Sequence, residues 1–276
     1  MYFEILHLKD LYPVLDRNGA DPTLEVMVQD TVIESKPKRP SMLICPGGGY
    51  GFTSPREAQN IGFEFMTMGL NAFVLHYSIK PHTYPQQIIE VACAMDYIVS
   101  NAERFNCDAE KTAIIGFSAG GHLVASYCTM RNRPEITEMI PEPKPVQAAI
   151  LSYPVITAET PTHFGSFYNL LGKTDLNEDD IERFSAEKHV SKELTPPTFI
   201  WTTAEDTTVD PINSLKYASA LSSNKIPFEL HVFPNGGHGL STAKFGTVNM
   251  PKLPVCDYTS VWVDYAKKWL RLVFDI

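Results

Sequence analysis

Short runs of apolar, often β-branched residues alternate with longer segments of helical periodicity from about residue 40 onward. Several runs are apolar at every position, as expected for strands of a parallel sheet that is covered on both faces. The predicted strands are 42–45, 72–77, 112–117, 147–153, 198–203 and 228–233. Two weaker candidates, 3–8 and 24–28, come before them and would supply an antiparallel edge.

The segments between these runs carry signals of helix ends. Ser54-Pro55-Arg56-Glu57 matches a capping box with proline at the first helical position, and Gly69 would end that helix. Residues 86–103 follow a proline and place their apolar residues on one stripe. Further helices are expected at 122–130, after Asp210-Pro211, and at 258–272.

This alternation predicts an α/β fold with a mostly parallel central sheet of about eight strands and helices on both faces. No repeat, low-complexity tract or linker rich in Gly or Ser divides the chain, so one domain, 1–276, is expected. Residues 154–197 break the pattern with prolines and acidic residues, and we expect them to form a modest cap above the strand ends. Residues 241–257 are predicted to be a loop before the last helix.

Composition excludes several classes of partner. The chain has 276 residues, 44% of them hydrophobic, which is enough for an ordinary globular core. Its formal net charge is −9 without a basic block, so a nucleic-acid partner is not expected. No stretch approaches the roughly 18 apolar residues that cross a bilayer, so a membrane partner is not expected either.

The cysteines and the first residues predict a reducing, cytoplasmic location. The five cysteines are odd in number, widely spaced and without a CxxC pair, and residues 1–10 lack the pattern of a secretory signal. No cluster of His, Cys, Asp or Glu has metal-ligand spacing, so neither a metal nor another cofactor is expected. The sequence leaves the oligomeric state open, a homodimer included.

Ser118 is the predicted nucleophile. Gly116-Phe117-Ser118-Ala119-Gly120 fits the G-x-S-x-G pattern, in which a serine occupies a sharp, strained turn from a strand to a helix. The pattern alone is weak, but here it directly follows a predicted strand and opens an apolar helix. The alternative is a glycine-rich turn with a solvated serine, which does not account for that context.

A glycine run follows the predicted strand 42–45. In Pro46-Gly47-Gly48-Gly49-Tyr50, the backbone N–H groups are unshielded, which suits an oxyanion hole. Phosphate binding is a poorer hypothesis because neither GxxxxGK[ST] nor GxGxxG is present, whereas a plain turn stays open. Esterases with three glycines usually have His before them, and Pro46 stands in that place here, so the loop must be held by other groups.

The acid should follow the serine in the chain, and three carboxylates compete after the strand 198–203. Asp210 precedes a proline at a helix start, so it is most simply a helix cap. Glu205 and Asp206 are adjacent and cannot both point at one histidine. Asp206 is preferred because its short side chain suits a fixed hydrogen bond to an imidazole.

His238 is the predicted base among eight histidines. It lies in Gly236-Gly237-His238-Gly239 directly after the strand 228–233, where glycines let a loop carry the ring to the nucleophile. The competitor His122 is one helical turn after Ser118 and is predicted to be a buried, hydrogen-bonded residue.

These motifs together resemble the acetyl-xylan-esterase-like and feruloyl-esterase-like branch of the α/β-hydrolases, whose members are often called sugar esterases or sugar hydrolases. The resemblance covers roughly residues 40–240 and includes Pro196-Pro197-Thr198-Phe199 and Asp206-Thr207-Thr208-Val209. It implies an α/β-hydrolase fold, a metal-free carboxylesterase and a triad of Ser118, Asp206 and His238. It places the oxyanion donors on the backbone N–H of Ala119 and of Gly48 or Gly49.

The leading hypothesis is a serine esterase that removes a small acyl group, above all acetyl, from a carbohydrate such as a xylo-oligosaccharide. Tyr50 and Phe52 flank the glycine run and are expected to contact this small-molecule substrate. Three further aromatic residues of segment 154–197 could form walls or simply pack that segment against the sheet: Phe164, Phe167 and Tyr168. The alternatives are a serine peptidase on the same fold and a catalytically silent binding module.

Overall fold

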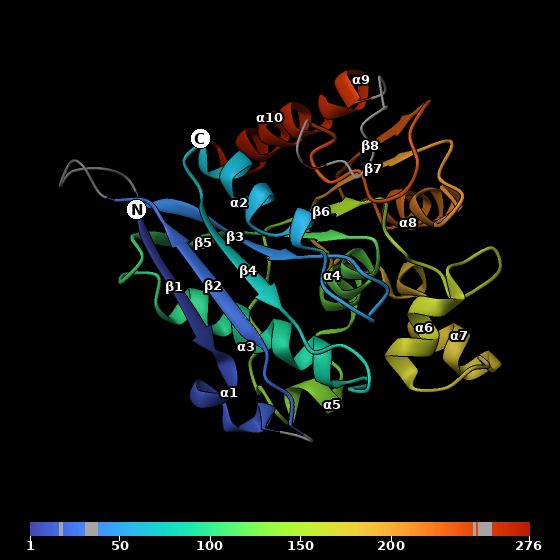
Figure 1. Ribbon diagram of the computed structural model, residues 1–276, viewed down its shortest axis with the longest axis horizontal. Helices are drawn as coiled ribbons and strands as arrows, with labels where there is room; N and C mark the ends of the chain where they lie inside the picture. The colour runs from blue at the N-terminus through green and yellow to red at the C-terminus, as the bar shows by residue number, and fades with distance from the viewer. Residues whose placement is uncertain (17–18, 31–37, 245–246, 248–255) are drawn as a thin grey trace.

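An eight-stranded sheet forms the centre of the computed structural model, which describes residues 1–16, 19–30, 38–244, 247 and 256–276 (Figure 1). The strands are β1 (Tyr2–His7), β2 (Thr23–Val28), β3 (Arg39–Cys45), β4 (Asn71–His76), β5 (Cys107–Phe117), β6 (Ala148–Ser152), β7 (Thr198–Thr203) and β8 (Phe228–Phe233). Their order is β1-β2-β4-β3-β5-β6-β7-β8. The pairs β1–β2 and β2–β4 are antiparallel and the others are parallel. The predicted sheet and its antiparallel edge are therefore confirmed.

Helices cover both faces of the sheet because the strands are apolar on both sides. In β3, Leu43 and Cys45 point to one hydrophobic core, whereas Met42 and Ile44 point to the other. The first core is closed by α3 (Gln86–Ser100), α4 (Ala119–Met130) and α8 (Ile212–Ser223). The second is closed by α2 (Gln59–Met66) and α10 (Trp262–Phe274).

The shorter elements lie around this frame. They are α1 (Leu8–Leu11), η1 (Pro13–Leu15), η2 (Pro55–Glu57), α5 (Pro134–Thr137), α6 (Phe164–Leu171), α7 (Glu178–Phe184), η3 (Ala186–His189) and α9 (Cys256–Ser260). Segment 154–197 contains α6, α7 and η3, and α6 and α7 lie on the side of the molecule opposite β1 (Figure 1). Most of the loop predicted at 241–257 lies outside the described residues. Within the described part, no helix has both the length and the apolar character that spanning a bilayer needs.

The capping box expected at residues 54–57 is wrong. Ser54 makes no side-chain cap, Pro55–Glu57 form only a 3₁₀ turn, and α2 begins at Gln59. Glu57 is 3% exposed, and its carboxylate points away from the helix start, toward the glycine run. The Glu57 side chain, which the local pattern assigns to a helix cap, thus forms a tertiary contact with the glycine run instead.

Candidate active site

Ser118 occupies the turn between β5 and α4 with φ 53° and ψ −118°, a strained conformation for a residue with a side chain. The flanking glycines are required because a side chain at either position would clash with the neighbouring backbone. A Cβ on Gly116 would lie 2.2 Å from the carbonyl oxygen of Gly120, and a Cβ on Gly120 would lie 2.2 Å from that of Cys45. The strand-to-helix turn therefore has the geometry that the G-x-S-x-G motif requires.

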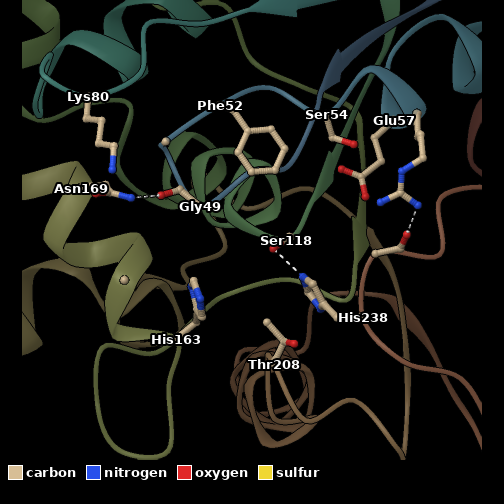
Figure 2. Close-up of a pocket in the computed structure, with 15 residues that line it drawn as sticks. Gly49, Phe52, Ser54, Glu57, Lys80, Ser118, His163, Asn169, Thr208 and His238 are labelled. Carbon is tan, nitrogen blue, oxygen red and sulfur yellow. Dashed lines mark hydrogen bonds between the residues drawn. The ribbon is translucent and has the colours of Figure 1, made fainter. Parts of the chain in front are cut away.

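Ser118, His238 and Asp206 form one chain of hydrogen bonds. The Ser118 Oγ lies 2.7 Å from Nε2 of His238, and Nδ1 of the same ring lies 2.7 Å from Oδ2 of Asp206 (Figure 2 shows the first contact). With the carboxylate on Nδ1, that nitrogen carries the proton, so Nε2 is free to accept from the serine hydroxyl. All three residues follow carboxyl ends of parallel strands, where α/β sheets place their sites.

Asp206 is fixed by its own backbone surroundings. Its side chain is fully buried, and Oδ1 accepts hydrogen bonds from the N–H groups of Thr208 and Val209, both at 2.9 Å. The competing carboxylates have other partners. Asp210 Oδ1 accepts from the N–H of Ile212 at the start of α8, as predicted for a cap. Glu205 accepts from the N–H of Gly236 and so holds the histidine loop.

The glycine run lies against the nucleophile. A Cβ on Gly47 would lie 3.0 Å from the Ser118 Cβ. The Gly47 N–H donates to Oε2 of Glu57 at 2.8 Å, so it is not available to a substrate. Gly48 and Gly49, the predicted donors, carry the next two N–H groups. Ala119 is the first residue of α4, where the N–H groups have no partner within the helix.

Side chains from two further segments hold the glycine run where the usual histidine is missing. The Tyr77 hydroxyl donates to the carbonyl oxygen of Pro46 at 2.7 Å. The Asn169 side chain, on α6, donates to the carbonyl oxygen of Gly49 at 2.8 Å (Figure 2). Together with Glu57, these contacts hold the run at Pro46, Gly47 and Gly49.

A cavity of about 420 Å³ opens over Ser118. Phe52 is 59% exposed and lies at its rim, on the side opposite His163 (Figure 2). Burial, followed by the nearby His238, lowers the pKa of His163, which favours a neutral ring there. The lining residues are Gly48, Gly49, Gly51, Phe52, Ser54, Arg56, Glu57, Lys80, Ser118, His163, Gly165, Asn169, Thr208, His238 and Gly239.

Tyr50 does not line this cavity, contrary to expectation. It has φ 56° and is 1% exposed, and its hydroxyl donates to Nδ1 of His122 at 2.9 Å. His122 is buried, as predicted, and its Nε2 donates to the carbonyl oxygen of Phe184. In α6, Phe167 is buried against His122, and Phe164 stacks on Tyr168 instead of lining the cavity.

Sequence reasoning missed several lining residues, chiefly Glu57, Lys80, His163 and Asn169. His163 and Asn169 come from segment 154–197, and no local motif marks them. Glu57 belongs to the tetrapeptide Ser54–Glu57, whose pattern predicts a capping box and not a part of the site. Among the described residues, no group of three or more His, Cys, Asp or Glu side chains is placed to hold a metal ion.

The BD-FAE family model matches residues 31–221. Endo-1,4-beta-xylanase B of Butyrivibrio fibrisolvens is 42% identical over 75% of this chain and 33% of its own length. Acetylxylan esterase of Xylanibacter ruminicola is 31% identical over 76% of this chain and 43% of its own length. The chain thus spans less than half the length of these curated relatives.

A solved structure matches almost the whole chain. The acetyl ester-xyloside bifunctional hydrolase from Caldicellulosiruptor lactoaceticus superposes with a TM-score of 0.84 at 29% identity, covering 99% of this chain and 97% of that one. The predicted resemblance to sugar esterases is therefore confirmed. The sheet order, the turn at Ser118 and these matches show that the chain belongs to the BD-FAE family and has the α/β-hydrolase fold.

Proposed function

We propose that this chain is a serine carboxylesterase that removes a small acyl group, above all acetyl, from a carbohydrate such as a xylo-oligosaccharide. The observation that carries the proposal is the hydrogen-bonded chain Ser118–His238–Asp206 at the floor of an open cavity. A catalytically silent binding module would have no need to keep this arrangement together with the strained turn.

The proposed reaction runs through an acyl-enzyme. The Ser118 Oγ attacks the ester carbonyl carbon while its proton passes to Nε2 of His238, and Asp206 stabilises the resulting imidazolium. The N–H groups of Ala119 and of Gly48 or Gly49 stabilise the negative oxygen. The C–O bond to the sugar then breaks, and the leaving sugar oxygen takes the proton from His238 and becomes a hydroxyl group. A water molecule repeats both steps and releases the free acid.

The surroundings of Ser118 support a small, polar substrate. A cavity of about 420 Å³ suits a small molecule rather than a folded polymer. Its rim offers the exposed ring of Phe52, a surface on which a sugar can stack, and polar groups on His163 and Asn169. The name of the Xylanibacter relative, acetylxylan esterase, supports the same substrate class.

The substitution Asp206→Asn tests the mechanism because the structure dictates how the asparagine must lie. Two backbone N–H groups hold Oδ1, so the side-chain oxygen of Asn takes that place and its NH₂ faces His238. Nδ1 must then accept, the proton moves to Nε2, and His238 can no longer accept from Ser118. We expect kcat to fall on the order of 10³- to 10⁴-fold.

Asp210→Asn is the matched control. It makes the same chemical change four residues away, and Asn is as good a helix cap as Asp. We expect wild-type kcat for hydrolysis of p-nitrophenyl acetate. Loss of activity in Asp210→Asn with retention in Asp206→Asn would refute the assignment. Faster turnover of acyl-peptide amides than of matched esters would favour the peptidase alternative instead.

A further inference from the structure

Glu57 is a buried carboxylate beside the nucleophile, and the proposed acyl transfer assigns it no step. It is 3% exposed and lines the cavity next to the glycine run (Figure 2). Both of its oxygens accept hydrogen bonds. Oε2 accepts from the Gly47 N–H at 2.8 Å, and Oε1 accepts from the Tyr153 hydroxyl at 2.6 Å.

Tyr153 extends this contact to the other side of the site. It follows β6, and its hydroxyl oxygen accepts from the N–H of Ser241 at 2.9 Å. Its ring packs edge-on against His238, with 5.0 Å between the ring centroids. The bonds Gly47–Glu57–Tyr153–Ser241 therefore join the glycine run to the loop that carries His238.

Arg56 reinforces the same link with its backbone and its side chain. The Ser241 hydroxyl donates to the carbonyl oxygen of Arg56 at 2.6 Å. The Arg56 guanidinium in turn donates to the carbonyl oxygen of Gly239, the residue after His238, at 2.8 Å. Arg56 and Glu57, two adjacent residues of η2, thus contact both the glycine run and the loop that carries His238.

The chemistry of these contacts calls for a carboxylate. Gly47 and Tyr153 both donate to Glu57, and only an ionised acid offers two acceptor oxygens and no donor. A glutamine would turn its NH₂ toward one of these donors. Burying an ionised carboxylate costs free energy even when both of its oxygens are hydrogen-bonded, and an apolar side chain would pack in this loop without that cost.

We propose that Glu57 and Tyr153 are positioning residues of the oxyanion hole. They hold the glycine run in place of the histidine that usually precedes three glycines in esterases and that is Pro46 here. By occupying the Gly47 N–H, Glu57 sets the orientation of the following peptides, so that the N–H groups of Gly48 and Gly49 face the reacting oxygen. Through Tyr153, the same contact keeps this run in register with His238. The inference rests on the proposed esterase function.

Such a role acts on the transition state more than on substrate binding. An oxyanion hole works only when its donors are already in place, and misplacement on the order of 1 Å can cost up to about 100-fold in rate. Removing the link should therefore lower kcat and leave KM nearly unchanged. It should also weaken inhibitors that imitate the tetrahedral intermediate.

Tyr153→Phe is the cleanest test, because it removes one oxygen and keeps the ring against His238. We expect kcat for p-nitrophenyl acetate to fall about 10- to 100-fold, with KM within about threefold of wild type. The inhibition constant of an alkyl boronic acid, which forms a tetrahedral anion on serine, should rise by a similar factor. Glu57→Gln should show the same pattern.

Tyr127→Phe is the matched control. Tyr127 is also buried, and its hydroxyl donates to a backbone carbonyl oxygen, that of Lys144, away from the site. Titration with a fluorophosphonate would normalise all rates to the fraction of folded enzyme. The inference is overturned if Tyr153→Phe and Glu57→Gln match Tyr127→Phe in kcat, or if KM rises while boronic acid affinity stays unchanged. Wild-type enzyme that neither turns over esters nor reacts with the fluorophosphonate would instead refute the proposed function itself.

Discussion

Replacing His122 by asparagine should change how the stability of the fold depends on pH. His122 lies on α4 one turn after Ser118, with its Nε2–H on Phe184 and its Nδ1 accepting from Tyr50. Burial lowers the pKa of His122 to about 4. A proton on Nδ1 would also turn that nitrogen into a donor facing the Tyr50 hydroxyl.

The effect of His122 on the free energy of unfolding follows from the difference between its pKa in the folded chain and its pKa in the unfolded chain. The unfolded histidine takes up its proton near pH 6.5 and the folded one only near pH 4. The contribution of His122 is therefore present above pH 6.5 and is lost as the pH falls toward 4. Each pH unit in this window changes the free energy of unfolding by about 1.4 kcal/mol, or roughly 3 kcal/mol in all.

Glu90 opposes this effect. It is buried on α3, where Oε2 accepts from the Ser78 N–H and Oε1 from the Gln86 side chain. Burial raises its pKa to about 7, so the folded chain keeps a proton that the unfolded chain loses near pH 4.5. Its contribution is present below pH 4.5 and is lost as the pH rises to 7. Between about pH 4.5 and 6.5, the slopes from His122 and Glu90 should nearly cancel.

Urea unfolding of wild type, His122→Asn and Glu90→Gln at several pH values from 4.5 to 7.5 tests this balance. The stability difference between wild type and His122→Asn should shrink as the pH falls. The difference between wild type and Glu90→Gln should grow over the same range. Curves that run parallel to wild type for either variant would show that the group concerned does not titrate as its burial indicates.

Two further predictions concern the nucleophile and the acyl group. Ser118→Ala should abolish covalent labelling by a fluorophosphonate while leaving the thermal unfolding temperature near that of wild type, and retained labelling would place the nucleophile elsewhere. Along p-nitrophenyl esters from acetate to octanoate, kcat/KM should be highest for acetate and propionate, because a methylene that clashes with a wall costs more than one that fits gains. A maximum at hexanoate or beyond would indicate a long acyl tunnel and contradict the sugar-acetyl proposal.

The fold could be predicted because its signals are local and repeated. Several strands of the sheet are apolar at successive positions, and this pattern does not depend on which helix covers them. The hydrogen-bonded chain Ser118–His238–Asp206 could be predicted for a similar reason. Each of its residues lies in the segment that follows a parallel strand, and the carboxyl ends of parallel strands meet at one edge.

Tyr50 and Phe52 show where local signals fail. Both flank the glycine run, and sequence distance alone puts both near Ser118. The carbonyl oxygen of Gly48 accepts from the N–H groups of Gly51 and Phe52, which closes a tight turn that has Tyr50 inside it and Phe52 at its end. Tyr50, at φ 56°, is directed into the core, whereas Phe52 stays at the rim. The geometry of the turn determines which of the two rings reaches the cavity, and the pattern of apolar residues in the sequence does not predict that geometry.

Glu57 shows a stronger form of the same limit. The tetrapeptide Ser54–Glu57 satisfies a local rule, and a helix does begin soon afterwards at Gln59. A capping contact of this kind contributes about 1 kcal/mol at a solvated helix end. The competing contacts are two hydrogen bonds to a buried carboxylate, and leaving a buried charge unpaired costs several times more. The tertiary contacts therefore win, and only a structure that brings Gly47 and Tyr153 to the same carboxylate can show it.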